Sequence, residues 1–168
     1  MSASGKVTLR QTEPSDLDAF YGHQLDPDAI RVAAFLGRIR SERAVFDAHW
    51  ANILKSGNFL RTVVVAGQVA GYVALYPDEG RLEVTYWIGK EFWGRGVATD
   101  ALAQVLRLVT TRPLFARAAA DNVGSLKVLQ KCGFKIIGHG RGFALGRGED
   151  TDECILRLDP AETGENPA

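Results

Sequence analysis

The chain has 168 residues, and its 20 Lys and Arg balance 20 Asp and Glu, so its formal net charge is zero. Hydrophobic residues make up 46% of the chain and charged residues 24%, which is typical of an ordinary globular domain rather than a disordered or fibrous protein. Zero net charge excludes the general positive field that attracts long nucleic acids. We therefore expect small molecules or peptides as partners and no nucleic acid.

Other absences narrow the setting. No apolar run approaches the roughly 18 residues that a membrane-spanning helix needs, and the polar N-terminus is unlike a signal peptide. We expect a cytoplasmic protein without a membrane partner. Cys132 and Cys154 have neither CxxC spacing nor a His at a zinc-like interval, which disfavours a disulfide scaffold and a metal site.

The N-terminal third predicts one strand followed by helices. The alternating residues 6–10 predict the strand, and the helix-start residues at 13–16 predict a helix that ends near Leu25. A second apolar-periodic run covers residues 29–36. Ser41 is expected to cap a third helix that ends near Lys55.

The middle of the chain changes to the period of strands. Residues 59–66 and 69–76 are rich in β-branched side chains and are separated by Gly67-Gln68, a two-residue hairpin signal. The turn residues 77–80 lead into a third strand at 81–88. Three consecutive strands predict an antiparallel meander.

The last part alternates helices and strands around glycine-rich segments. A loop at 89–95 precedes a helix at 96–111, which Pro113 is expected to stop. The remaining expected elements are a strand at 114–120, a helix at 122–132, a strand at 134–139, a glycine-rich connection at 140–148 and a strand at 153–158. This order predicts one α/β domain over residues 1–159, with a mixed, mainly antiparallel sheet of about seven strands flanked by helices, and a disordered tail at 160–168.

The most informative segment runs from the strand at 81–88 through a glycine-containing loop into a helix. Gly94 and Gly96 let the backbone approach a ligand closely, and the first amides of the helix have no partner within it. With Arg95 adding positive charge, this segment predicts a pyrophosphate site. An ordinary turn before a helix is the alternative. Thr99 replaces the third glycine of GxGxxG, which argues against a dinucleotide-binding fold.

These residues resemble the GNAT superfamily of acyl-CoA-dependent N-acetyltransferases. The family's pyrophosphate loop, Gln/Arg-x-x-Gly-x-Gly/Ala, falls on residues 93–98. Its second signature falls on Asn122-Val-Gly-Ser125 and Gly133-Phe134. The branch typified by the ribosomal-protein N-terminal acetyltransferases is most similar, and the resemblance covers residues 63–138. It implies a GNAT-like fold with a splayed central strand pair.

The resemblance implies acetyl-CoA as the cosubstrate and no metal. The loop and helix start would hold the pyrophosphate, while the preceding strand and Asn122 would hold the pantetheine arm. Lys127 would meet the 3′-phosphate, although a solvated lysine on the helix surface is the alternative. The implied cofactor-binding residues are Tyr86, Trp87, Ile88, Trp93, Gly94, Arg95, Gly96, Val97, Ala98, Thr99, Asn122, Ser125 and Lys127. Trp93 departs from the family's Gln/Arg, which leaves Arg95 as the main cation of the loop.

Acetylation of an amine calls for two further groups, a general base for the amine and a proton donor for the leaving thiolate. An amine attacks only when it is neutral, so a general base helps at neutral pH, and Glu83 is the candidate; an outward-facing strand residue is the alternative. Many relatives supply an acid from a Tyr where this chain has Leu129. The resemblance gives that role to Ser125, but Ser125 could instead bond the helix backbone. Solvent could also protonate the thiolate.

The sequence says least about the binding site of the acceptor amine. Relatives build it from the N-terminal helices, so Phe35, His49 and Trp50 are candidates for a substrate pocket, with core packing as the equal alternative. Arg141, in the glycine-rich connection, could read acidic groups of the substrate. The expected reaction is direct transfer to a small-molecule or peptide amine, and a cysteine route through Cys132 is disfavoured. A CoA-binding sensor without turnover is the alternative function, and a homodimer is left open.

Overall fold

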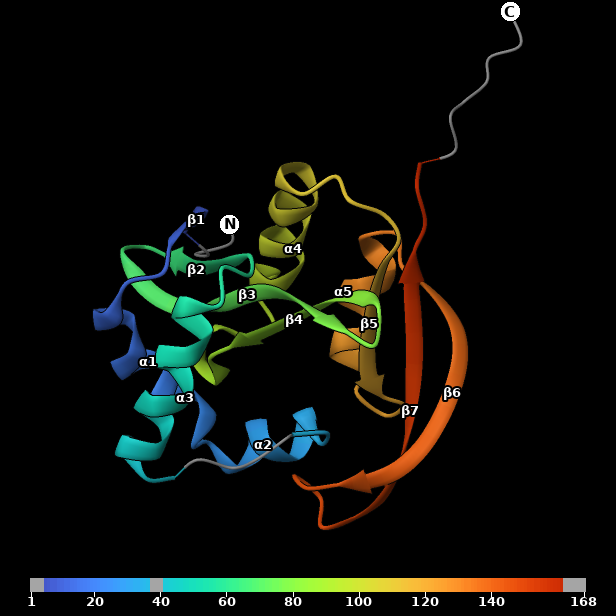
Figure 1. Cartoon of the computed structure of the whole chain (residues 1–168), viewed down its shortest axis with the longest axis horizontal. Coiled ribbons are helices and arrows are strands. Elements are labelled where there is room, and N and C mark those ends of the chain that lie inside the picture. Colours follow the sequence, from blue (N-terminus) through green and yellow to red (C-terminus); the bar gives the residue numbers. More distant parts are fainter. Residues whose placement is uncertain (1–4, 37–40, 162–168) are drawn as a thin grey trace, which may run out of the picture.

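Seven strands form one sheet, in the order β1-β2-β3-β4-β5-β7-β6, in the computed structural model, which describes residues 5–36 and 41–161 (Figure 1). The strands are β1 (Val7–Gln11), β2 (Leu60–Val65), β3 (Gln68–Asp78), β4 (Arg81–Ile88), β5 (Leu114–Ala119), β6 (Lys135–Ala144) and β7 (Glu149–Leu158). The α-helices are α1 (Leu17–Gln24), α2 (Pro27–Ala33), α3 (Arg43–Lys55), α4 (Val97–Leu108) and α5 (Val123–Lys131). Short 3₁₀ turns, η1 (Pro14–Asp16) and η2 (Lys90–Phe92), precede α1 and α4. The predicted mixed α/β fold is confirmed.

Alternation along the strands gives the sheet two buried faces. On one face, Val73 and Val84 pack with Val97 and Ala101 of α4 and with Leu129 of α5. On the other face lies an aromatic cluster beneath α1 and α3, formed by Phe20, Phe46, Trp50 and Tyr72. Figure 1 shows α1, α2 and α3 in its lower half and α4 near its top. Helices α4 and α5 therefore cover one face of the sheet, and helices α1 and α3 cover the other.

The strand pair at the centre of the sheet opens after a single contact. All other neighbouring strands are antiparallel, whereas β4 and β5 are parallel and share one bridge, Glu83 with Phe115. In Figure 1, β4 runs across the view while β5 runs up and down it. β4 continues for five residues beyond this bridge. The expected splayed pair is thus present, and its opening lies beside the end of β4.

The expected glycine-rich connection at residues 140–148 is wrong. β6 continues to Ala144 and β7 begins at Glu149, so the two strands form a long hairpin. Glycine lacks a side chain but keeps its main-chain donor and acceptor, so a full ladder with β7 holds this segment extended. At the hairpin tip, the N–H of Gly146 donates to the Ala34 carbonyl over 2.8 Å, and a Cβ there would lie 2.3 Å from the Ile30 carbonyl oxygen.

Several expected boundaries also shift. The hairpin after β2 turns at Ala66-Gly67, both with positive φ, rather than at Gly67-Gln68. Glu42, not Ser41, occupies the N-cap position of α3. The helix that contains the apolar run at 29–36 begins at Pro27, a residue suited to a first turn, but stops at Ala33, because Ala34 turns to φ 60°.

The helix expected to reach residue 111 also ends early. α4 stops at Leu108, because Val109 is extended and the Arg112 guanidinium donates to the carbonyls of Leu106 and Val109. No helix within the described ranges is long and apolar enough to cross a membrane. The tail expected at 160–168 falls, from residue 162 onward, outside the described residues.

Candidate active site

The end of β4 offers main-chain groups to the opening beside β5. The Gly89 N–H donates to the Ala70 carbonyl over 2.8 Å, so alternate residues of β4 bond to β3. By the same alternation, the main-chain groups of Tyr86 and Ile88 point away from β3, toward the opening. The Ile88 carbonyl accepts a 2.8 Å hydrogen bond from the indole of Trp93. The N–H of Ile88 and both main-chain groups of Tyr86 therefore line a strand edge that β5 does not cover.

The start of α4 lies just after this strand end. Gly94 and Gly96 both have φ 74°, which favours glycine, and Gly96 is the N-cap of the helix. The N–H of Asp100 makes the first helical bond, to the Gly96 carbonyl, so the amides of residues 97–99 have no acceptor within the helix. No side chain caps them. Three free donors at the positive end of the helix dipole form a seat for an anion.

Side-chain charge is also available at this loop. Arg95 is exposed, and its guanidinium lies 5.6 Å from the centre of the Phe92 ring. No carboxylate within residues 5–36 and 41–161 forms an ion pair with it. Lys127, the predicted contact for a terminal phosphate, is exposed one turn into α5. Both cations are therefore placed to meet an anionic ligand from solvent.

Glu83 is buried, contrary to its alternative as an outward-facing strand residue. Its side chain is 4% exposed, and it lies on the face of the sheet that also carries Tyr76, Arg117 and Glu153. The Tyr76 hydroxyl donates to Oε2 over 3.2 Å, and the Arg117 Nε lies 3.3 Å from Oε1. Burial, followed by the neighbouring charge of Glu83, raises the pKa of Tyr76 to about 12, so this phenol remains a donor.

Ser125 meets a residue from β4. Its Oγ lies 2.7 Å from the Tyr86 hydroxyl, while its own N–H donates to the Asn122 side chain over 3.1 Å. Burial raises the pKa of Tyr86 to about 12, although the hydrogen bond to Ser125 opposes that effect. Leu129, where relatives carry a Tyr, is fully buried in the core. The structure therefore brings one phenol and one hydroxyl together at the opening, with the phenol on the strand instead of the helix.

Asn122 and Cys132 have structural partners. The Asn122 side chain accepts from Ser125 N–H, capping α5, and donates to the Val32 carbonyl over 3.3 Å. Cys132 is half-buried, its thiol donates to the Thr99 carbonyl over 3.7 Å, and burial raises its pKa. A raised pKa leaves less thiolate, so this cysteine is a poor nucleophile.

The predicted acceptor residues do not converge. Trp50 is 5% exposed and packs among the rings of Phe20 and Tyr72, whose centres lie 5.1 and 4.9 Å away, so it belongs to the core. Phe35 packs against a small alanine cluster beneath the hairpin. His49 is half-buried on α3. Arg141 pairs with Asp152 over 2.8 Å, on the opposite face of the sheet from Glu153.

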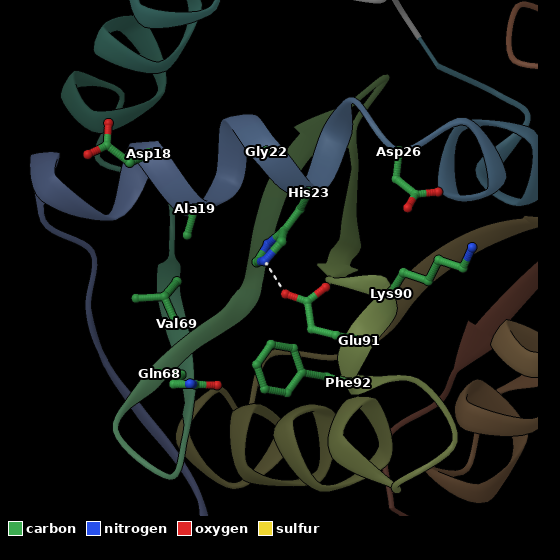
Figure 2. A pocket seen from close by; sticks show the side chains of 10 residues that line it. All are labelled: Asp18, Ala19, Gly22, His23, Asp26, Gln68, Val69, Lys90, Glu91 and Phe92. Carbon is green, nitrogen blue, oxygen red and sulfur yellow. Dashed lines mark ion pairs between the residues drawn. The ribbon is translucent and has the colours of Figure 1, made fainter.

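A separate hollow of about 440 Å³ lies between α1, the β2–β3 hairpin and η2 (Figure 2). His23 points from α1 toward Glu91, with Nε2 3.5 Å from Oε1, and its side chain is nine-tenths buried. Burial lowers the pKa of His23. The lining residues are Asp18, Ala19, Gly22, His23, Asp26, Gln68, Val69, Lys90, Glu91 and Phe92. None of the predicted site residues lines this hollow. In the described residues, no group of three or more His, Cys, Asp and Glu could hold a metal ion.

Sequence reasoning missed Tyr76, Arg117 and Glu153. Tyr76 could have been found, because a turn at Glu79-Gly80 places it opposite Glu83. The sequence carries no comparable signal for Arg117 and Glu153. They reach Glu83 only because β5 pairs in parallel with β4 after a helical crossover, and because β7 then pairs with β5.

The chain was compared with known proteins. The family model described as "Acetyltransferase (GNAT) domain" matches residues 6–135. The chain is 22% identical over 165 residues to "Uncharacterized N-acetyltransferase p20" from Bacillus licheniformis, covering 91% of this chain and 92% of that relative.

Solved structures share the fold. The ribosomal-protein-alanine N-acetyltransferase from Brucella melitensis has a TM-score of 0.75 at 20% identity, covering 90% of this chain and 99% of that one. The spermidine N-acetyltransferase from Vibrio cholerae, solved in complex with CoA and spermine, also has a TM-score of 0.75, at 17% identity, covering 91% of this chain and 94% of the other.

Proposed function

Because this chain belongs to the GNAT acetyltransferase family, we propose that it transfers an acetyl group from acetyl-CoA directly to a primary amine. The observation that carries the proposal is the juxtaposition at the end of β4. An uncovered strand edge, an uncapped helix start and a buried carboxylate lie along one short run of chain, from Glu83 to Thr99. A thioester donor with an anionic pyrophosphate needs these parts together.

The cosubstrate fits the residues as follows. The pyrophosphate would accept hydrogen bonds from the amides of residues 97–99, with Gly94 and Gly96 allowing close approach and Arg95 adding charge. Pantetheine would lie along Tyr86, Trp87 and Ile88. The N–H of Ile88 would also stabilise the oxyanion that forms on the thioester carbonyl. Lys127 would contact the 3′-phosphate, and Asn122 would support the arm mainly by fixing the start of α5.

Glu83 would act as the general base. Alkyl ammonium groups have pKa values near 10 and α-ammonium groups near 8, so most acceptors arrive protonated at neutral pH. Glu83 takes that proton, directly or through water, and the neutral nitrogen attacks the thioester carbon. The C–S bond then breaks and the nitrogen releases its second proton, which the departing thiolate takes up, directly or through solvent, to give the free CoA thiol. The acetyl group never rests on the protein, in agreement with the raised pKa of the Cys132 thiol.

The departing thiolate would be met by Ser125, supported by Tyr86. The two hydroxyls are 2.7 Å apart, so Tyr86 can hold the Ser125 hydroxyl in a donating orientation. A thiol has an ordinary pKa of about 8.5, so a hydrogen bond suffices and a strong acid is not required. This pair of hydroxyls would take the role of the tyrosine that many relatives carry at the position of Leu129.

The acceptor is a protein N-terminus or a small-molecule amine. The two structural neighbours named above are enzymes for a ribosomal protein and for spermidine, so the fold serves both substrate classes. The resemblance of the chain to the ribosomal-protein branch favours a peptide α-amine, whose lower pKa also eases deprotonation.

The test is amine-stimulated release of CoA thiol, measured with acetyl-CoA against peptides with free N-termini, polyamines and simple alkylamines. Glu83→Gln should lower the rate strongly at neutral pH and much less at high pH, where the amine is already neutral. An unchanged pH profile would remove Glu83 from the reaction. Binding of CoA with no amine-stimulated release across the whole panel would instead favour a CoA-binding sensor, the alternative suggested by Leu129.

A further inference from the structure

Three charged side chains lie in a row on neighbouring strands, all on the face of the sheet opposite α4. They are Glu83 on β4, Arg117 on β5 and Glu153 on β7. Arg117 Nε is 3.3 Å from Glu83 Oε1, and Arg117 Nη1 is 3.7 Å from Glu153 Oε1. The Arg117 side chain is 42% exposed, whereas the Glu83 and Glu153 side chains are 4% and 14% exposed. One half-exposed cation therefore pairs with a buried carboxylate, Glu83, and a partly buried one, Glu153.

We propose that Arg117 is a positioning residue for the base Glu83, and that Glu153 limits how much of the Arg117 charge Glu83 receives. This rests on the proposed function, in which Glu83 accepts the proton of the acceptor amine. A buried carboxylate without a charge partner is costly and tends to take up a proton. Arg117 supplies the partner without competing for the proton, because a guanidinium stays charged at any working pH.

The geometry leaves Glu83 able to accept a proton. Among the described residues, Arg117 forms an ion pair with Oε1 and the Tyr76 hydroxyl donates to Oε2, so the two partners are divided between the two oxygens. A carboxylate oxygen can accept two hydrogen bonds, so one site on each remains for water or an amine. Two partners from two different strands also fix the side-chain orientation, which is what a residue that meets a substrate at a set distance requires.

Other titratable and charged groups lie on this face of the sheet, and the described residues show ion pairs of Glu83 only with Arg117. On β3 they are Tyr76 and, near the turn, Asp78. Arg81 on β4 lies over the Phe115 ring, 4.5 Å from its centre, and Arg157 on β7 pairs with Asp159. From the helices on this face, His23 of α1 lies at the other end of β4, against Gly89.

Neighbouring variants should shift the pH profile in opposite directions. In Arg117→Met, the acidic limb of kcat/KM should move to higher pH by about 1 to 3 units, because the buried carboxylate loses its cation. Arg117→Lys should restore most of the profile. In Glu153→Gln, the limb should move to lower pH by up to about 1 unit, because Glu83 no longer shares Arg117 and loses a nearby negative charge. CoA affinity should stay within twofold in all three variants.

The readout separates positioning from simple structural damage. A general loss of stability does not move one variant up in pH and its neighbour down. Superimposable profiles for Arg117→Met and Glu153→Gln would overturn the proposal, as would movement of both in one direction. If Arg117→Met does not fold, the Glu153→Gln variant alone tests the proposal: a shift of its acidic limb to lower pH supports it, and an unshifted limb overturns it. Full activity of Glu83→Gln at neutral pH would refute the proposed base itself, a different result from unshifted profiles in an enzyme that still needs Glu83.

Discussion

Gly96→Ala tests the pyrophosphate seat most directly, because the chain offers a matched control. Gly96 has φ 74° at the N-cap of α4, and Gly57 has φ 76° just after α3. An added Cβ would meet no atom within 4 Å at either position. Both substitutions should therefore cost about 1 to 2 kcal/mol of folding free energy, from the left-handed backbone alone. The two variants differ in that only the methyl group at Gly96 would adjoin the proposed pyrophosphate site.

Gly96 directly precedes the free amides of residues 97–99, so we expect a methyl group there to crowd a pyrophosphate held on them. A pyrophosphate that must back away loses charge-assisted hydrogen bonds, each worth about 1.5 to 3 kcal/mol. The loss of one such bond weakens binding about 10- to 100-fold, since 1.4 kcal/mol corresponds to tenfold in Kd. Gly57→Ala should bind CoA with the wild-type Kd, because α3 covers the other face of the sheet.

The assay is calorimetric titration of wild-type protein and both variants with CoA, alongside thermal unfolding of each. We expect equal losses of Tm and a large loss of affinity in Gly96→Ala alone. A Gly96→Ala protein that binds CoA within twofold of wild type would refute the assignment of the pyrophosphate to this helix start. Equal weakening in Gly57→Ala would show that the effect arises from destabilisation.

Three further predictions follow from buried groups. Burial alone would raise the pKa of Asp16, but hydrogen bonds from Arg10, the Glu13 N–H and Thr62 lower it overall. Because Arg10 is 39% exposed and stays solvated without its partner, Asp16→Asn should destabilise the fold by about 1 to 3 kcal/mol at pH 7, mainly through weakened hydrogen bonds. Because the pKa of Asp16 is depressed in the folded state, this contribution is present above the unfolded pKa, near 4, and is lost as the pH falls through the folded pKa. In urea unfolding, the difference in unfolding free energy between wild type and Asp16→Asn should therefore shrink as the pH falls. A difference that grows in acid would contradict the depressed pKa. Tyr86→Phe should keep CoA affinity while lowering kcat several-fold, and unchanged kcat would show that the Ser125 hydroxyl needs no support. Trp50→Ala should lower the free energy of unfolding in urea by about 3 to 5 kcal/mol, because Trp50 packs in the core. Near-wild-type stability would instead favour the interpretation of Trp50 as part of a substrate pocket.

Much of the fold was predictable because local patterns and turn chemistry agree with it. The strand at residues 81–88 was predicted with its observed bounds, since alternation and the following Gly89 mark both its period and its end. The error at residues 140–148 arose from treating glycine as a break. Glycine weakens a strand but does not prevent one, because it keeps its main-chain N–H and C=O, and here residues 140–144 pair along β7. Residues 140–144 form a strand because they pair with β7, and a short stretch of sequence does not reveal this pairing.

The site divides in the same way. The proposed cofactor site is local in sequence: Gly94, Arg95 and the first turn of α4 are consecutive, so their spacing alone predicts an anion site. The sequence also proposed Glu83, but it could not decide between an exposed and a buried carboxylate.

The sequence by itself therefore determined the family and the order of the elements, and it predicts a seat for an anionic cosubstrate, because all three depend on residues adjacent along the chain. Only the tertiary structure decided the surroundings of the proposed base. Arg117 and Glu153 lie 34 and 70 residues beyond Glu83, and they reach it through a parallel pairing across α4 followed by an antiparallel one. Zero net charge gave no sign of this row, because charges that cancel over the whole chain can still be ordered side by side across three strands.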